Sequence, residues 1–571
     1  MNPGEARAIF RPGGRGGRRW APLRLALAVL LFAAAAGAPS RASPVDGSAA
    51  LRTAFDAAAP MPMPGRVVAH ESALLRAVYA GRADQPLWSD RGRLTKQGAQ
   101  LADILRSVDR YGLQSSDYAA EPIAAERLRL EAAGAQSAAQ WIPLDLMLSR
   151  AAIRLVTHLH FGRVDPRAAG FELGKPRSDL DVAATVAALA SAADVTAGLS
   201  AVEPNFYHYR LLESALGRYR QLAADQSLAR LPPLPRRTMR LGDPYAGAPA
   251  LRRLLSALGD LPGAWKQASS RSEILDAELI DALTRFQARN GLTADGELGR
   301  HTFAVLTTPL SQRVRQIELT LERWRWLPAF HAPPIIVNIP QFRLFAFPTV
   351  ADRVQGMLQM PVIVGQTYPR TRTPVFIGQM KYVIFRPYWD VPYSITLREM
   401  LPAIRKHADY LQKNQLEIVR GESDEGTVVP PSPAAFAALA AGQLRLRQRP
   451  GEDNALGLIK FIFPNAHNVY LHSTPAHQLF LQSRRTFSHG CIRVSDPVAL
   501  ARYVLRNGPG VWDDERIVAA MHGPDSTRII LPSPIPVMVL YGTAEATEAG
   551  PILFFEDIYG HDRKLAALLR Q

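Results

Sequence analysis

The spacing of apolar residues predicts helices in the first part of the chain and strands in the last part. From residue 71 to about 230, apolar residues recur every three or four positions, the period of a helix with one buried face. From residue 334 onward, short runs such as Ile335–Ile339 and Lys381–Phe385 are rich in β-branched and aromatic residues. We therefore expect a multidomain α+β protein, with a mainly helical domain at 71–230 and a mostly-β domain at 325–555.

A compact helical module is predicted between these two domains, at 236–310. The proline-rich run Leu231–Pro235 separates it from the first domain and reads as a stiff linker. Two amphipathic stretches follow, around 251–258 and 279–286, and a turn-rich loop leads to a short closing helix near Thr302. The pattern indicates three short helices.

Residues 394–455 interrupt the strand pattern of the last domain. They are rich in helix formers, and Ser394 stands where it could cap a first helix. We expect a helical insertion that acts as a lid, although a static decoration would give the same pattern. Residues 556–571 are expected to form a C-terminal tail.

The first 42 residues have the pattern of an export signal. The first 24 carry six arginines and one acidic residue, and residues 25–36 are wholly apolar. Twelve apolar residues are too few to span a bilayer comfortably, but they suit the apolar core of a secretory signal. We expect a signal peptide at 1–42, or an uncleaved membrane anchor, then a linker at 43–70 and a periplasmic location.

The formal net charge of +16 suggests an anionic partner. Residues 1–42 hold seven arginines and one glutamate, so the chain without them keeps +10. Such a protein is attracted to polyanions, and export favours the carboxylates and phosphates of a cell envelope over nucleic acid. A GC-rich genome would also explain the excess of arginine.

The single cysteine, Cys491, is the candidate nucleophile. It lies in Ser488-His489-Gly490-Cys491 and cannot form an internal disulfide. A thiol nucleophile needs a base and backbone N–H groups that can stabilise an oxyanion. His472, 19 residues upstream at the end of an alternating strand, is the candidate base. Gly490 would let a carbonyl approach the backbone, and the N–H groups of Gly490 and Cys491 are the expected oxyanion donors.

The module and the last domain each resemble a family of bacterial cell-wall proteins. The module resembles the three-helix peptidoglycan-binding domain at Phe286, Gln287, Gly291, Leu292, Asp295, Gly296, Gly299 and Thr302. The last domain resembles the L,D-transpeptidase catalytic domain, or YkuD fold, at His472, Ser488–Cys491 and Arg493, with support from Val364, Gly365, Arg372–Pro374 and Trp389–Ile395. The whole arrangement is most similar to the large YcbB-type proteobacterial members.

The resemblance implies roles for the matching residues. Cys491 would be the nucleophile, and His472 would be the general base, oriented by the backbone carbonyl of Ser473. His489 and Gly490 would shape the oxyanion pocket. The remaining substrate-binding positions that it implies are Arg493, Trp389, Ser488 and Tyr470. We expect the pKa of the thiol to be lowered, as in other cysteine nucleophiles.

The implied reaction is crosslinking of peptidoglycan stems. Cys491 would attack a tetrapeptide donor, release its terminal D-Ala and form a thioester, which the side-chain amine of an acceptor stem would resolve as a 3→3 crosslink. Carbapenems are expected to trap the thiol covalently, and other cell-wall synthesis enzymes are candidate partners. The alternatives are an L,D-carboxypeptidase or endopeptidase acting on the same stems, and a non-catalytic wall-binding protein.

No cofactor or metal is expected. A metal site would have to combine His467, His472, His477, His489 and Cys491. The first three are five residues apart, which places them neither on one helix face nor on one strand face.

Overall fold

The computed structural model describes residues 51, 53 and 70–570, apart from 81–84, 175–179, 263–271, 351–354, 422–425 and the single positions 229, 330 and 549. The predicted signal segment, 1–42, lies outside the described residues, and so does nearly all of the predicted linker, 43–70. Within the described part of the chain, no helix is long and apolar enough to cross a membrane.

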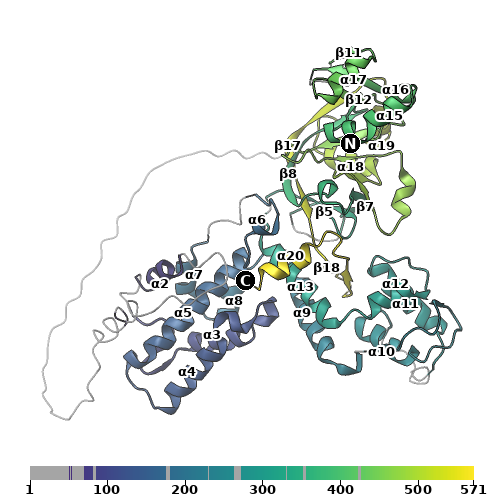
Figure 1. Ribbon diagram of the computed structural model, residues 1–571. Helices are drawn as coiled ribbons and strands as arrows, with labels where there is room; N and C mark the ends of the chain where they lie inside the picture. The colour runs from purple at the N-terminus through teal and green to yellow at the C-terminus, as the bar shows by residue number, and fades with distance from the viewer. Residues whose placement is uncertain are drawn as a thin grey trace, which may run out of the picture. The chain divides into compact units, whose positions relative to one another are not determined.

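The N-terminal domain is helical, as predicted (Figure 1). Its main helices are α2 (Glu71–Ala80), α3 (Lys96–Arg106), α4 (Ala120–Ala132), α5 (Ala138–Phe161), α7 (Val182–Leu189), α8 (Val195–Val202) and α9 (Tyr207–Ala224). Helix α5 begins at a capping box formed by Ser137 and Gln140, and it contacts α2, α3, α4, α7 and α8. It is buried along most of its length and forms the centre of this domain's core.

The module has the three helices that the sequence predicts. They are α10 (Ala248–Leu258), α11 (Ala277–Arg289) and α12 (Arg300–Leu306). Helix α10 ends at Gly259, whose φ of 90° is the left-handed conformation that favours glycine. A short pairing of β3 (Thr238–Met239) with β4 (Leu298–Gly299) joins the start of the module to its last loop.

The last domain is built on a nine-stranded sheet with the order β15-β7-β16-β14-β13-β8-β17-β5-β6. Strand β6 also pairs with β7, so the sheet closes on itself. The strands are β5 (Ile335–Asn338), β6 (Arg343–Ala346), β7 (Leu358–Gly365), β8 (Phe376–Phe385), β13 (Ile459–Ile462), β14 (Leu471–His472), β15 (Thr486–Ser488), β16 (Ile492–Val494) and β17 (Thr527–Leu540). Helix α18 (Pro497–Leu505) follows β16 and is capped by Asp496, as the sequence suggested.

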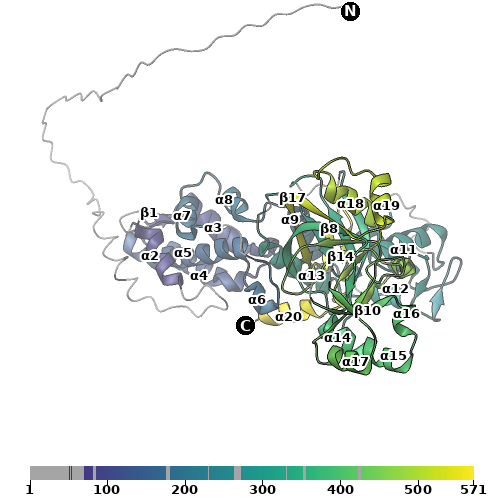
Figure 2. The same cartoon turned by 90° about the horizontal axis from the view of Figure 1, so that it is seen from above.

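The insertion is mixed rather than helical. Its helical segments are α14 (Tyr393–Ile395), a π-helical turn (Thr396–Met400), α15 (Leu401–Lys406), α16 (Tyr410–Lys413) and α17 (Pro433–Ala440). They pack beside a four-stranded sheet with the order β11-β10-β12-β9, formed by Thr427–Val429, Leu416–Arg420, Arg445–Gln448 and Trp389–Asp390 (Figure 2). Ser394 is not a cap, because the first helix begins one residue earlier, after Pro392.

The C-terminal segment, expected as a tail, contains a packed helix. Helix α20 (His561–Leu568) contacts α6 (Pro166–Ala169) and α13 (Leu310–Arg325). An ion pair of 2.6 Å joins Arg323 on α13 to Asp562 on α20. The segment is therefore part of the folded core. The sequence did not indicate this, because the helices that α20 contacts are far from it along the chain.

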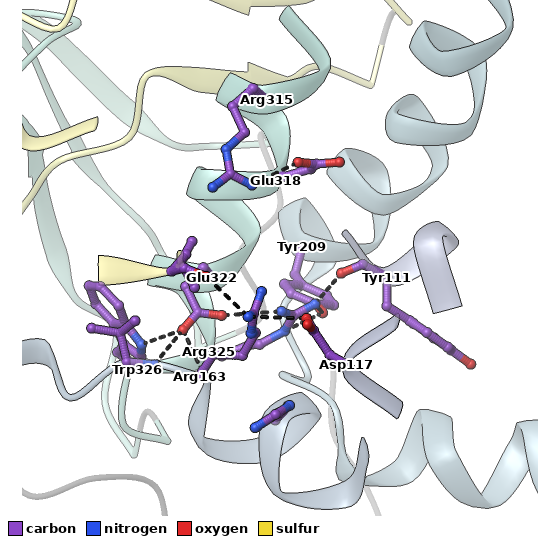
Figure 3. A network of polar contacts seen from close by, with 12 residues as sticks. Tyr111, Asp117, Arg163, Tyr209, Arg315, Glu318, Glu322, Arg325 and Trp326 are labelled. Carbon is purple, nitrogen blue, oxygen red and sulfur yellow. Dashed lines mark hydrogen bonds and ion pairs between the residues drawn. The ribbon is translucent and has the colours of Figure 1, made fainter. Parts of the chain in front are cut away.

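Helix α13 is attached to the N-terminal domain through buried charges (Figure 3). Arg325 forms an ion pair with Glu322 at 3.4 Å and donates hydrogen bonds to the hydroxyl of Tyr209 and the carbonyl of Tyr111. Glu322 also accepts a hydrogen bond from the backbone N–H of Arg163, at 2.5 Å. We call these residues, with Asp117, the junction cluster; Asp117 forms an ion pair with Arg163 at 3.1 Å.

Candidate active site

Three neighbouring strands place the candidate residues on one face of the sheet. Strand β14 runs parallel to β16 with His472 opposite Arg493, and antiparallel to β13 with Lys460 opposite His472. Leu471 and Ile492, one position away on β14 and β16, are completely buried in the core. Because side chains alternate along a strand, Lys460, His472 and Arg493 form a row on the opposite face.

Cys491 and Tyr470 lie in the next row of the same face. The carbonyl of Tyr470 accepts a hydrogen bond of 3.0 Å from the N–H of Ile492, which fixes Cys491 beside Tyr470. The Sγ atom of Cys491 lies 3.6 Å from the carbonyl oxygen of Asn468. The nucleophile is thus held by a paired strand on one side and the sharp Ser488–Gly490 loop on the other.

The thiol is not acidified, which corrects the expectation of a lowered pKa. Burial raises the pKa of Cys491 above its ordinary value, although hydrogen bonds from Tyr470 and the nearby charges of Lys460 and Arg493 oppose the shift. The resting sulfur is therefore a protonated thiol near neutral pH, and a base must take its proton during the reaction.

His472 is held as a neutral base. Its side chain is 3% exposed, and Nδ1 lies 2.6 Å from the carbonyl oxygen of Ser473. Since a carbonyl only accepts, Nδ1 carries the proton and Nε2 is free to receive another. Burial lowers the pKa of His472 to about 3, with further lowering by Arg493 and Lys460. The contact predicted with Ser473 is present.

His472 and Cys491 are diagonal neighbours on the sheet face, not hydrogen-bonded partners. Among the described residues, the hydrogen-bond partners of the sulfur are Asn468 and Tyr470. Adjacent strands lie about 4.8 Å apart and alternate residues about 6.6 Å apart along a strand, so the two backbone positions stand roughly 8 Å apart. Rotation of either side chain can shorten this separation, and catalytic hydrogen bonds often tighten only when substrate binds.

The loop before Cys491 is locked by Ser488. Its hydroxyl donates to the carbonyl of Cys491 and accepts a hydrogen bond of 3.1 Å from the N–H of Gly490. The Gly490 N–H is therefore engaged, which corrects its expected role as an oxyanion donor. The N–H of Cys491 has no hydrogen-bond partner among the described residues, and Gly490 has a φ of 120°, which favours glycine.

Thr373 and Tyr559 hold the same loop from the side, and sequence reasoning gave neither this role. The hydroxyl of Thr373 accepts from the N–H of Gly365 and donates to the carbonyl of Gly490, both at 2.8 Å. Tyr559, inside the expected tail, donates to the carbonyl of Gly365 at 2.6 Å. A Cβ at Gly365 would lie 2.0 Å from the carbonyl oxygen of Thr371, so only glycine fits. The segments around Gly365 and Thr373-Pro374 were the parts of the sequence that could have indicated this support of the catalytic loop.

The insertion reaches the catalytic loop at His489. Its Nε2 lies 3.0 Å from a carboxylate oxygen of Glu399, which is in the π-helical turn of the insertion. Both side chains are exposed. Trp389 lies on β9 and packs against the apolar cluster of the insertion, and its substrate-binding role stays a prediction.

The other histidines are not gathered around the thiol. His467 lies 3.1 Å from a carboxylate oxygen of Glu172, and His477 is exposed. In the described ranges, no three His, Cys, Asp or Glu side chains are grouped so that they could hold a metal ion.

A buried neutral imidazole, a thiol on the same face and an open backbone N–H define the class of the site. It is a cysteine nucleophile arranged for acyl transfer, in which a carbonyl is attacked and its oxyanion is held by the backbone.

Comparison with known proteins agrees with this class. Residues 333–524 match the family model "L,D-transpeptidase catalytic domain" (YkuD), 247–306 match "Putative peptidoglycan binding domain" and 73–216 match "Scaffold domain". The chain therefore contains an L,D-transpeptidase catalytic domain together with a domain of the peptidoglycan-binding family, as its residues indicated.

One curated relative shares a long stretch of sequence. It is described as "Putative L,D-transpeptidase", from Haemophilus influenzae, and is 30% identical over 280 residues. The match covers 48% of this chain and 54% of the relative, so the chain spans about half the length of the curated relative that it matches. The closer likeness to the YcbB type stays a prediction.

Proposed function

We propose that the protein is a peptidoglycan L,D-transpeptidase that forms 3→3 crosslinks through a thioester on Cys491. The observation that carries the proposal is the placement of the only cysteine on one sheet face with His472, inside a domain that matches this enzyme family. The neighbouring domain of the peptidoglycan-binding family supports a cell-wall substrate.

In the first step, Nε2 of His472 takes the proton of the Cys491 thiol as the sulfur attacks the carbonyl of the third stem residue. The Cys491 N–H donates to the oxyanion that forms. The bond from this carbonyl carbon to nitrogen then breaks, and the imidazolium returns the proton to the leaving amine. Free D-Ala departs, and the tripeptide remains on sulfur as a thioester.

In the second step, the side-chain amine of an acceptor stem attacks the thioester carbonyl. His472 takes a proton from the amine nitrogen, the carbon–sulfur bond breaks, and the proton returns to Cys491. The amide formed is the crosslink. Water would give a trimmed stem instead, so exclusion of water matters. The insertion, which contacts His489 beside the nucleophile, is the element positioned to exclude it.

Because the Cys491 thiol and the His472 imidazole are both neutral at rest, negative charge forms in the site only during the reaction. Attack creates a thiolate and then an oxyanion in a buried site, where an unpaired negative charge is costly. Lys460 and Arg493 on the same face supply positive potential for these charges. The cations thus favour the charged states of the reaction over the neutral resting thiol.

A second candidate function uses the same residues. An L,D-carboxypeptidase would follow the same first step and resolve the thioester with water. The partial exposure of Cys491, which leaves a thioester within reach of water, is the observation that favours it. A wall-binding protein without catalysis would have no need of a neutral, oriented imidazole.

The location proposed is the periplasm, after export directed by residues 1–42. Their basic start and apolar run support it. The stems of peptidoglycan are the proposed partners, and a carbapenem is the proposed covalent inhibitor because its strained carbonyl would acylate the same sulfur.

The test is incubation of purified protein with disaccharide-tetrapeptide, followed by separation of the products. We expect dimers and free D-Ala, both absent with Cys491→Ala. Trimmed monomers without dimers, even at high acceptor concentration, would support the carboxypeptidase. No product at all from folded wild-type protein would overturn both.

A further inference from the structure

Arg493 is a cation that has no carboxylate partner among the described residues. Its Nε atom is buried and has no hydrogen-bond partner among the described residues. Among the described residues, the titratable group that acts on its pKa is the Cys491 thiol, and none of the groups that act on Cys491 or His472 is a carboxylate. Burying a guanidinium without a partner is costly, so this arrangement needs an explanation in function.

The cation stands at a defined distance from the nucleophile. Arg493 follows Cys491 by two positions on β16, so its Cα lies about 6.6 Å along the strand and its side chain is on the same face. Lys460 stands on the other side of His472, with its Nζ 4.0 Å from the centre of the Tyr470 ring. The field of the site is therefore positive from two sides.

The donor stem brings one anion to this position. When Cys491 attacks the third residue of a tetrapeptide, the leaving residue is the last one, and its free carboxylate is separated from the scissile nitrogen by a single carbon. In a pentapeptide the carboxylate would lie roughly 3.5 Å farther along the stem. A planar guanidinium is the side chain best suited to hold a carboxylate through two hydrogen bonds.

We propose that Arg493 binds the free C-terminal carboxylate of the donor stem, so that it selects stems ending one residue beyond the scissile bond. Lys460 adds positive potential from the other side of His472. The inference rests on the proposed function and deepens it, because it names the group of the substrate that one residue recognises. Arg493 is then a substrate-binding residue rather than part of the proton-transfer machinery.

The experiment compares two donors that differ only at the C-terminus: disaccharide-tetrapeptide as the free acid and as the carboxamide. Release of D-Ala or D-Ala amide gives kcat/KM for each. We expect wild type to prefer the acid by about 10- to 100-fold, the range of a charge-assisted hydrogen bond. In Arg493→Gln, the rate with the acid should fall further than the rate with the amide, until the preference is under about 3-fold.

Two controls separate recognition from other effects. Arg484→Gln removes an arginine of the same segment that is exposed and lies 3.4 Å from Glu556, and it should keep the full preference. The rate of Cys491 alkylation by iodoacetamide, followed against pH, reports the thiol itself. Arg493→Gln should move that profile toward higher pH, because Arg493 lowers the pKa of the thiol, and this effect slows both donors alike. A large fall in alkylation, matched by equal losses with both donors, would mean that Arg493 acts through the thiol and would overturn the inference.

The inference and the proposed function fail in different ways. Equal turnover of acid and amide by wild type would overturn carboxylate recognition and leave the transpeptidase standing. No turnover of either donor, with an intact fold and a reactive thiol, would overturn both.

Discussion

The junction cluster and the catalytic face each hold an arginine with a buried guanidinium nitrogen, and they treat its charge in opposite ways. In the junction cluster, Arg325 meets Glu322 and Arg163 meets Asp117, within a network of hydrogen bonds that joins α13 to the helical domain (Figure 3). On the catalytic face, Arg493 meets a thiol and an imidazole, and no carboxylate acts on it. In the junction cluster the paired charges join α13 to the helical domain, whereas the charge of Arg493 is the one that we propose binds a substrate carboxylate.

The first way to sharpen this comparison is to remove Cys491, the nucleophile that lies beside Arg493. Cys491→Ala should abolish D-Ala release and crosslinking, a loss of more than about 1,000-fold, because no other group can form the thioester. Product analysis measures the loss. The free energy of unfolding, measured in urea, should change by less than about 1 kcal/mol, because the sulfur has only weak contacts. Substantial crosslinking by this variant would contradict the assignment.

The second way is to neutralise one arginine in each region. Arg325→Gln leaves Glu322 buried without its cation and should lower the free energy of unfolding by about 3–5 kcal/mol. Arg493→Gln removes a charge that has no carboxylate partner and should leave that free energy unchanged within about 1 kcal/mol, or raise it. Urea denaturation of both variants beside wild type measures the contrast. Equal destabilisation would erase the distinction between the regions.

The third way is to titrate His472. Its folded pKa is lowered to about 3, below the ordinary value of about 6.5, so protons favour the unfolded chain. Burial of the neutral histidine therefore does not lower the free energy of unfolding above pH 6.5. That free energy decreases as the pH falls from 6.5 toward 3. Between pH 7 and pH 4.5, wild type should lose about 2 kcal/mol more than His472→Gln. An identical loss in both proteins would mean that His472 is not buried as a neutral base.

The fourth and smallest effect concerns the insertion. Glu399→Gln removes an exposed contact with His489, and exposed pairs are worth at most about 1 kcal/mol. We expect KM for the acceptor to rise by less than about 5-fold and the fraction of hydrolysed donor to rise with it. Asp409→Asn, which breaks the exposed pair with Lys413 on the same insertion, is the matched control and should change neither. A larger change in Asp409→Asn than in Glu399→Gln would contradict a role for the Glu399–His489 contact.

Sequence reasoning succeeded where the signal is local. Helical periodicity predicted the N-terminal domain and the three helices of the module, and the Asp496 cap with Pro497 predicted α18. The Ser488–Cys491 motif and the resemblance that it carries identified the domain. Each of these depends on residues that are close together in the chain, so the pattern is complete before folding.

Sequence reasoning failed where contacts between distant segments, or the burial of a side chain, determine the structure. Strand β17 contains three prolines, which are unusual in a strand. Its register shift between Ile530 and Ile535 accommodates Pro532 and Pro534, whereas Pro536 stays paired with Gln379. Tyr559 reaches Gly365 from 194 residues away. The pKa of Cys491 depends on burial, which no motif encodes, and the Gly490 N–H was taken by Ser488, a contact that needs the folded loop.

The most direct measurement of the central claim is the intact mass of the protein after mixing with disaccharide-tetrapeptide and no acceptor. The account predicts that wild type gains the mass of the donor less D-Ala, that an added acceptor amine discharges the adduct, and that Cys491→Ala stays unmodified. An adduct that persists in Cys491→Ala, or crosslinks formed by wild type with no acyl-enzyme under any condition, would contradict it.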